Sequence, residues 1–389
     1  MSLVGRYSKF SKDPLYMSEV FSNRNKKPVH SCIFDYVQKL IFSGEYDSKR
    51  KLPTDHQLMR QFGVSRATVV KAMRDLEHRG LVDRRPGIGS FAKLNAHPHH
   101  TLFSVLIAGL GDTEFFEPIC AAIALSCHKN NHGLLWGDLT DIHKKKLTEQ
   151  SCQTIVRGLV AKKVSGVFFV PDELDDENEN NDSNQMLVDA ISNAGIKIVL
   201  IDRDICTFPS SGPHDVVGID NFRAGFDQTN HLIQNGCRRI LYLTRPGILS
   251  TKTARIAGYC HAMEQAGLER GQRWICQGNV RDALLIDEIL SHKPDGIACF
   301  HDPIAAELIQ SLLLRNIAIP RQIKIIGLDD VKYSQLIQVP LTTIRQPCRD
   351  IGIQATNLMI ERIHGVSLPP RHVFMPTELI VRDSTSLQT

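Results

Sequence analysis

Residues 62–91 read FGVSRATVVKAMRDLEHRGLVDRRPGIGSF, and this stretch decides the fold of the first part of the chain. Its first half carries the apolar side chains Val69, Met73 and Leu76 at helical spacing, which predicts a helix with one buried face. Ser65 stands just before them, and its hydroxyl can accept a hydrogen bond from a backbone N–H of the first turn. The sequence therefore predicts a helix that begins directly after Ser65.

The opposite face of this predicted helix carries Arg66, Thr68 and Lys71. A guanidinium fork, a hydroxyl with a methyl group and a flexible cation are groups that read base edges and hold phosphates in a major groove. An exposed helix face with the same residues is common in proteins that bind no DNA, so this face alone does not decide the function.

A small β-hairpin is predicted after the helix, with strands near 81–82 and 90–91. Its turn combines positive charge with glycines, which allow the backbone to approach another surface closely. The residues that form this predicted wing are Arg84, Arg85, Gly87, Gly89 and Ser90.

Helix, turn, helix and wing in this order resemble the winged helix-turn-helix of the GntR family, and the resemblance extends upstream to KLPT at 51–54. Thr54 is the expected N-cap of a first helix over 55–61, and His56 stands where many relatives carry arginine. The resemblance implies a DNA partner and a set of DNA contacts. These are Thr54, His56, Ser65, Arg66, Thr68, Lys71, Arg84, Arg85, Gly87, Gly89 and Ser90.

The chain has 389 residues, of which 42% are hydrophobic and 23% are charged, as in ordinary globular proteins with two or three domains. Residues 1–95 hold 18 Lys/Arg and 9 Asp/Glu, a net +9, whereas the remainder is net −5. A basic first part on an acidic body favours a polyanionic partner at one end only. The sequence shows no membrane-spanning run and no secretory signal, so a cytoplasmic location is expected.

Ten cysteines are scattered without a C-x-x-C pair, which predicts reduced thiols and neither disulfides nor a metal site. His97, His99 and His100 form a histidine cluster without a nearby fourth ligand, so no metal is expected there either. We expect no cofactor. The acidic segment 172–184 is predicted to be a surface insertion, and residues 1–27 a flexible basic tail.

Beyond residue 101, apolar runs of strand length alternate with amphipathic stretches of helix length, as in parallel sheets covered on both faces. The predicted α/β body is too long for one sheet, which indicates two doubly wound lobes, with ligands beyond the carboxyl ends of the strands. Strands are predicted at 102–110, 133–137, 164–170, 196–201, 216–219, 240–244, 297–300 and 323–328.

The strand ends carry IDR at 201–203, GIDN at 218–221, ARIAGY at 254–259, FHD at 300–302, IGLDD at 326–330 and PLTTIRQP at 340–347. Together they resemble the LacI-type effector domain, which has the fold of periplasmic sugar-binding proteins. A GntR-type head on this body resembles the arabinose-repressor class. The resemblance implies a sugar effector, with arabinose as the default, held by Phe115, Phe116, Asp202, Arg255, His301, Asp302, Asp329 and Gln346.

Chemistry agrees with this set, because a carboxylate accepts from two adjacent hydroxyls and an arginine fork donates to ring oxygens. Each residue has a structural alternative. Asp202 or Asp329 could cap a turn, Arg255 could form an ion pair, and the two phenylalanines could belong to the core. His301 stands where many relatives have asparagine.

The expected organisation is a tail over 1–27, a winged helix-turn-helix over 28–94, a linker over 95–101 and an effector domain over 102–385. Its first lobe comprises 102–219 and 345–371, and its second 220–344 and 372–385. The sequence predicts a dimeric repressor that a sugar releases from a palindromic operator. The alternatives are a sugar-responsive activator, a GntR-headed enzyme and a transport solute-binding protein. The enzyme would require a catalytic constellation and the solute-binding protein a secretory signal, and neither is expected from this sequence.

Overall fold

The computed structural model describes residues 29–43, 51–78, 81–85, 87–92, 101–107, 114–137, 148–172, 182–247, 250–269, 271–366 and 368–386. The chain forms two compact units: the first unit is Met1–His100 with Ile360–Pro369, and the second unit is Thr101–Met359 with Pro370–Thr389. The predicted tail, the histidine cluster and most of the acidic insertion lie outside the described residues. Within the described part, no helix is long and apolar enough to span a membrane.

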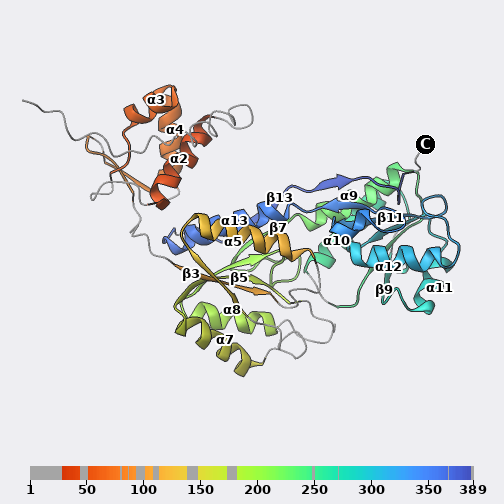
Figure 1. Cartoon of the computed structure of the whole chain (residues 1–389). Coiled ribbons are helices and arrows are strands. Elements are labelled where there is room, and N and C mark those ends of the chain that lie inside the picture. The colour runs from red at the N-terminus through yellow and green to blue at the C-terminus, as the bar shows by residue number, and fades with distance from the viewer. Residues whose placement is uncertain are drawn as a thin grey trace, which may run out of the picture. The chain divides into compact units, whose positions relative to one another are not determined.

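The first unit has the predicted winged helix-turn-helix, with three helices followed by an antiparallel hairpin (Figure 1). Thr54 caps the second helix in a reciprocal capping box with Gln57, and Gly63 ends that helix at φ 62°, a conformation that glycine adopts readily. The elements are α2 (Val29–Ser43), α3 (Asp55–Phe62), α4 (Arg66–His78), β1 (Val82–Arg85) and β2 (Gly89–Ala92).

One hydrophobic cluster holds the first unit together. Val69, Met73 and Leu76 are fully buried in it, which confirms the predicted stripe on α4. Val366, which lies far along the chain, is buried in the same cluster, with Leu368 packed against it. The first unit therefore includes a segment that follows α13 (Cys348–Ile363), as well as the N-terminal helices.

The second unit contains two six-stranded sheets, which confirms the predicted α/β class. The first sheet has the order β13-β7-β6-β5-β3-β4 and is parallel throughout. Helices α5 and α13 cover one face of it, and α7 and α8 cover the other (Figure 1). Its elements are β3 (Leu102–Ile107), α5 (Phe116–Lys129), β4 (Gly133–Gly137), α7 (Glu149–Ala161), β5 (Val164–Val170), α8 (Asp182–Asn193), β6 (Lys197–Ile201), β7 (Asp215–Ile219) and β13 (His372–Met375).

The second sheet has the order β14-β12-β11-β10-β8-β9 and is parallel except for the pair β12 and β14. Helices also lie on both of its faces, with α9 and α10 on one and α11 and α12 on the other (Figure 1). Its elements are α9 (Asn221–Gln234), β8 (Ile240–Thr244), α10 (Ser250–Gln265), η1 (Gln272–Trp274), β9 (Ile275–Gln277), α11 (Ala283–Ser291), β10 (Gly296–Cys299), α12 (Asp302–Leu313), β11 (Lys324–Asp329), η2 (Lys332–Gln335), β12 (Thr342–Arg345) and β14 (Glu378–Ile380).

The predicted lobe boundary between residues 371 and 372 differs from the observed strand pairing. Strand β13 pairs in parallel with β7, with His372 opposite Val216, so it belongs to the first sheet. After β13 the chain returns to the second sheet at β14, which pairs with β12. Strand β13 is a short edge strand of mixed polarity, so its sequence carries no long apolar run that would assign it to a lobe.

Two glycines let α9 and α10 pack closely. A Cβ atom at Gly225 would lie 2.1 Å from the carbonyl oxygen of Arg255, and one at Gly258 would lie 2.0 Å from that of Phe222. No side chain fits at either distance without moving the backbone. This close contact fixes the start of α9 relative to α10, which carries the expected effector contact Arg255.

Candidate functional site

The exposed face of α4 carries the cations that were predicted to read DNA. Arg66 and Lys71 are exposed, whereas Val69 and Met73 on the opposite face are buried. Thr68 is half-buried, and its hydroxyl lies 3.0 Å from that of Ser65. Ser65 also accepts a hydrogen bond from the backbone N–H of Thr68 at 3.4 Å, so Ser65 serves the start of the helix.

Helix α3 begins with the other two candidates. The Thr54 hydroxyl accepts from the Gln57 N–H at 3.3 Å, and the Gln57 side chain accepts from the Thr54 N–H at 2.8 Å. Thr54 therefore caps the helix while remaining exposed, and His56 is exposed in its first turn. A neutral imidazole at this position offers one donor where arginine would offer a charged fork.

The two arginines of the wing differ in exposure and in their ion-pair partners. Arg84 Nη2 lies 2.7 Å from Asp55 Oδ2 and ties β1 to the start of α3, with 26% of its side chain exposed. Arg85 is 59% exposed, pairs with Asp83 at 2.9 Å and lies 5.1 Å from the centre of the Phe91 ring. Arg85 is thus the more available of the two to a phosphate.

Gly87 and Gly89 have φ values of 74° and 136°, which side chains rarely adopt. Ser90 is buried, and its carbonyl oxygen accepts from the Leu52 N–H at 2.9 Å. Ser90 was expected to contact DNA, but in the structure it supports the wing from its buried side. Its place on the inward face of β2 follows from strand alternation.

In the second unit, Asp202 follows β6 in a left-handed conformation, with φ 70°. Its Oδ2 atom accepts from Arg203 Nε at 3.0 Å, while its buried Oδ1 atom has no hydrogen-bond partner among the described residues. Gly218 makes room for this turn, because a Cβ there would lie 2.7 Å from the Asp202 carbonyl oxygen. A buried acceptor without a donor is costly unless a ligand or water supplies one.

Arg255 on α10 is buried and already has two protein acceptors. Its Nε donates to Asn221 Oδ1 at 2.8 Å, its Nη1 donates to the Phe300 carbonyl oxygen at 2.7 Å, and its guanidinium lies 4.5 Å from the centre of the Phe300 ring. These contacts hold the guanidinium in one orientation between the start of α9 and the end of β10. An arginine fork has five N–H donors, so this arrangement leaves donors for a further acceptor.

Asp329 ends β11 with φ 117°, and Gln346 follows β12. Gln346 Nε2 donates to Asp329 Oδ1 at 2.8 Å, whereas the buried Gln346 Oε1 has no partner within the described chain. Desolvation raises the pKa of Asp329 well above its usual value, and the nearby Arg255 charge opposes that rise. The charges of Asp202 and Asp302 raise it further, so these carboxylates lie within electrostatic reach of one another.

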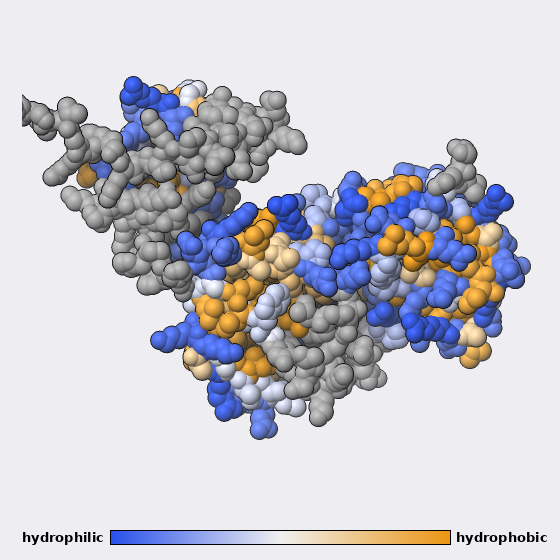
Figure 2. All heavy atoms as spheres, viewed as in Figure 1, coloured by the Kyte–Doolittle hydropathy of each residue, from blue (hydrophilic) through white to orange (hydrophobic). Residues whose placement is uncertain are grey.

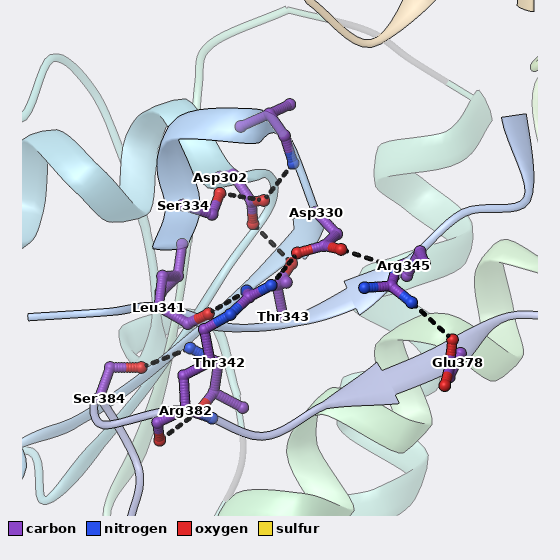
Figure 3. Close-up of polar contacts among 11 residues, drawn as sticks. Asp302, Asp330, Ser334, Leu341, Thr342, Thr343, Arg345, Glu378, Arg382 and Ser384 are labelled. Carbon is purple, nitrogen blue, oxygen red and sulfur yellow. Dashed lines mark hydrogen bonds and ion pairs between the residues drawn. The ribbon is translucent and has the colours of Figure 1, made fainter. Parts of the chain in front are cut away.

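Asp302 was expected to contact the effector, but the structure places it in the interior of the second lobe (Figure 3). Its Oδ1 accepts from Thr343 Oγ1 at 2.6 Å, and its Oδ2 accepts from Ser334 Oγ at 2.7 Å and the Val331 N–H at 3.1 Å. Burial raises the pKa of Asp302 to about 6 despite these donors. Three protein donors occupy this carboxylate, so it positions the loop after β11.

His301 caps α12, since its Nδ1 accepts from the Ile304 N–H at 3.2 Å. Phe115 and Phe116 are buried at the start of α5 in an edge-to-face pair with centroids 4.9 Å apart. Arg203 lies 5.9 Å from the centre of the Phe116 ring, which connects the pair to Asp202.

A pocket opens next to this cluster within the second unit. Asp202, Asn221 and Thr251 line it, and Arg255, Asp329 and Gln346 do not. The pocket therefore adjoins the expected contacts and shares only Asp202 with them. Its other lining residues are Arg203, Asp204, Cys206, Phe208, Pro209, Ser210, Ser211, Val216, Gly218, Ile219, Asp220, Phe222, Ser250, Ala254, His372 and Phe374.

The candidate set from the sequence omitted two residues that the structure brings to this site. Asn221 orients Arg255, and Arg203 pairs with Asp202 at 2.9 Å. Both belong to motifs that the sequence analysis singled out, GIDN and IDR, so their position directly after polar strand ends was the available signal.

Two family models match the chain. Residues 30–91 match the bacterial regulatory proteins of the gntR family, and residues 229–385 match the periplasmic binding protein-like domain. The first match covers the three helices and the wing, and the second covers the lobe that contains Arg255, Asp302 and Asp329.

Three similar proteins are named as regulators. The arabinose metabolism transcriptional repressor of Geobacillus stearothermophilus is 25% identical over 89% of this chain and 94% of its own length. The HTH-type transcriptional repressor PurR of Vibrio vulnificus is 27% identical over 69% of this chain and 77% of its own. The HTH-type transcriptional regulator DegA of Bacillus subtilis is 30% identical over 59% of this chain and 66% of its own.

Solved structures share the fold. The transcriptional regulator CelR in complex with cellobiose has a TM-score of 0.62 at 19% identity, covering 92% of this chain and 100% of that one. The transcription regulator CcpA of Lactococcus lactis has a TM-score of 0.63 at 19% identity, covering 74% of this chain and 99% of that one. A periplasmic binding protein/LacI regulator from Alkaliphilus metalliredigens, complexed with D-xylulofuranose, has a TM-score of 0.60 at 21% identity over 74% and 100%.

Proposed function

Because the chain joins a GntR-type winged helix-turn-helix to a periplasmic-binding-protein-like effector domain, we propose that it is a transcriptional repressor released from its operator by a carbohydrate. The observation that carries this proposal is the presence of a cationic α4 face in one unit and a buried, incompletely paired carboxylate and amide cluster in the other. Such a protein acts in the cytoplasm, where the bacterial chromosome lies.

The proposed DNA contacts follow from exposure. Arg66 would read a base edge, with guanine as the expected partner, and Lys71 and Arg85 would bind phosphates. Arg84 would keep its ion pair with Asp55 and present the wing. Each contact to a phosphate releases counterions, so affinity should fall steeply with salt.

The proposed effector is a polyol. Asp202 Oδ1 and Gln346 Oε1 are buried acceptors without partners among the described residues, and two adjacent hydroxyls are the donors that would satisfy them. Arg255 would donate to a ring or hydroxyl oxygen, and Phe116 would face the C–H side of the ring. L-Arabinose is the first sugar to test, because a repressor of arabinose metabolism resembles this chain over nearly its full length.

We propose that two copies of the chain act together on a palindromic operator, as half-sites require. Large hydrophobic side chains are exposed on the second unit, and Figure 2 shows hydrophobic patches between hydrophilic residues there. The most exposed are Leu284, Leu314 and Leu336. Effector binding would then change the spacing of the two heads and lower operator affinity.

Fluorescence anisotropy with a duplex selected from a random pool tests this function. Operator affinity is expected to fall at least about tenfold, or about 1.4 kcal/mol, at saturating L-arabinose or at another sugar that raises the melting temperature. A sugar that binds and raises operator affinity would favour the activator or co-repressor alternative. If no pentose, hexose, deoxyhexose or uronic acid both binds and alters affinity, the proposed sensing role fails.

A further inference from the structure

A second cluster of ligand-type side chains lies in the second lobe, and none of its residues belongs to the proposed DNA or effector contacts. Cys276 lies on β9, and Glu288 and His292 lie on and directly after α11. One ligand atom from each, the thiol sulfur, a carboxylate oxygen and a ring nitrogen, lies within 4.8 Å of the other two.

The sequence places these atoms together in two steps. Glu288 and His292 are four residues apart, so a helix brings both side chains to one face. Leu285, Ile286 and Ile289 of α11 pack into the same hydrophobic core as Cys276, which turns that helix toward β9. Strand β9 is an edge strand of its sheet, so one side of the cluster stays open to solvent.

No hydrogen bond or ion pair of the described chain uses the Cys276 sulfur, the Glu288 carboxylate or the His292 ring nitrogens. The His292 ring lies 5.7 Å from the Trp274 ring at 43°, which limits its rotation. Cys276 is buried, whereas Glu288 is exposed and His292 is half-buried. The thiol thus lies on the buried side of the cluster, and the carboxylate lies on its exposed side.

We propose that Cys276, Glu288 and His292 bind a thiophilic divalent cation such as Zn²⁺, with water completing the coordination. Sulfur, imidazole nitrogen and carboxylate oxygen together are the donors that Zn²⁺ prefers. Tetrahedral binding requires ligand atoms roughly 3.5 Å apart. The ligand atoms of Cys276, Glu288 and His292 all lie within 4.8 Å of one another, and Glu288 is exposed and His292 half-buried.

The charges of the cluster suit a dication. A bound dication replaces the thiol proton of Cys276 and neutralises the thiolate and the Glu288 carboxylate together. One proton is released as the metal–sulfur bond forms.

This proposed site departs from the expectation, drawn from the sequence, that no metal is bound. That expectation rested on the absence of C-x-x-C pairs, and the spacing of 276, 288 and 292 matches no common zinc motif. The three ligands are brought together only by the packing of α11 against the sheet. A bound ion would connect this edge strand to the helix, and so would stabilise the second lobe.

Titration of chelator-treated full-length protein with Cd²⁺ tests the site, because cadmium–thiolate bonds absorb in the ultraviolet. The parent chain is expected to bind one equivalent with this signal, and Cys276→Ser is expected to lose it. Cys260→Ser is the matched control, since it removes another thiol of the same lobe from α10 and should leave the signal unchanged.

His292→Ala and Glu288→Gln keep the test independent of the buried thiol, because both side chains reach the surface. Each should weaken binding of Zn²⁺ at least about tenfold, and Zn²⁺ should raise the melting temperature of the parent but not of His292→Ala. Equal binding by the parent, Cys276→Ser and His292→Ala would mean an adventitious ion only and would overturn the proposal.

Discussion

Gln346 Nε2 donates a hydrogen bond to Asp329 Oδ1 at 2.8 Å, which joins the residue two positions before α13 to the end of β11. The other amide atom, Gln346 Oε1, is buried without a partner among the described residues. This single amide thus holds a carboxylate at one end and leaves an acceptor for a ligand hydroxyl at the other.

Replacing Gln346 with alanine should weaken binding of the sugar effector roughly tenfold, since one hydrogen bond is worth about 1 kcal/mol and the Asp329 carboxylate loses its donor. Isothermal titration with the sugar that shifts the melting temperature measures this. Gln310→Ala, an exposed change on α12 of the same unit, is the control and should bind as the parent does. Unaltered affinity of Gln346→Ala would remove this residue from the site.

Because α9 packs closely on α10, adding a methyl group to a glycine at this contact should affect stability more than adding one to an open helical glycine. Gly225→Ala should destabilise the second unit by roughly 1–3 kcal/mol, because its Cβ would overlap the Arg255 carbonyl oxygen. Gly158→Ala on α7 meets nothing within 4 Å and should be neutral or stabilising by up to about 1 kcal/mol. Chemical denaturation measures both, and similar values for the two variants would contradict the packing.

The raised pKa of Asp302 predicts a pH dependence of stability. Its folded value of about 6 exceeds the unfolded value of about 4, so the folded state binds this proton more tightly. Its contribution is therefore complete below about pH 4 and is lost as the pH rises through about 6, by roughly 2–3 kcal/mol. The Asp302→Asn variant keeps an acceptor for the Val331 N–H. Its free energy of unfolding should fall less than that of the parent between about pH 5 and 7.5. Parallel profiles for parent and variant would refute this.

Burial of Val366 in the core of the first unit was not expected from its position in the chain. Val366→Ala should destabilise the first unit by about 1–3 kcal/mol, because the side chain is buried among residues of α2, α3 and α4. Hydrogen exchange of amides in α2 and α4 should quicken. Unchanged protection of these two helices would show that the segment after α13 does not support the first unit.

The helices and wing were predictable because the caps and the apolar spacing are local properties. Ser65, Thr54 and Gly63 mark ends of elements that the structure shows, and Val69 and Met73 lie on the buried face as predicted. Most strands of the two sheets were likewise predictable from continuous apolar runs.

Side-chain roles at the strand ends could not be predicted in the same way. Asp302 and Asp329 both follow buried strands, but Asp302 turns inward to Ser334 and Thr343, which lie more than thirty positions along the chain. Asp330 similarly pairs with Arg345 at 2.7 Å and Arg382 at 2.6 Å (Figure 3). Such partners depend on which strands become neighbours, and no local pattern encodes that. Only the three-dimensional structure therefore shows which of these carboxylates are paired within the fold.

The central claim is that the exposed face of α4 reads DNA, and the salt dependence of duplex binding tests it most directly. We predict that Arg66→Ala with Lys71→Ala lowers affinity for the selected duplex at least about 100-fold, since a guanine contact contributes roughly 1–3 kcal/mol and a phosphate contact adds to it. The slope of log affinity against log salt concentration should also become shallower by about 1, because one phosphate contact is lost. Arg157→Ala with Lys162→Ala, which removes the same charge from α7 and its end in the second unit, should bind as the parent does. Equal affinity of the Arg66/Lys71 variant and the parent across the salt range would contradict the account.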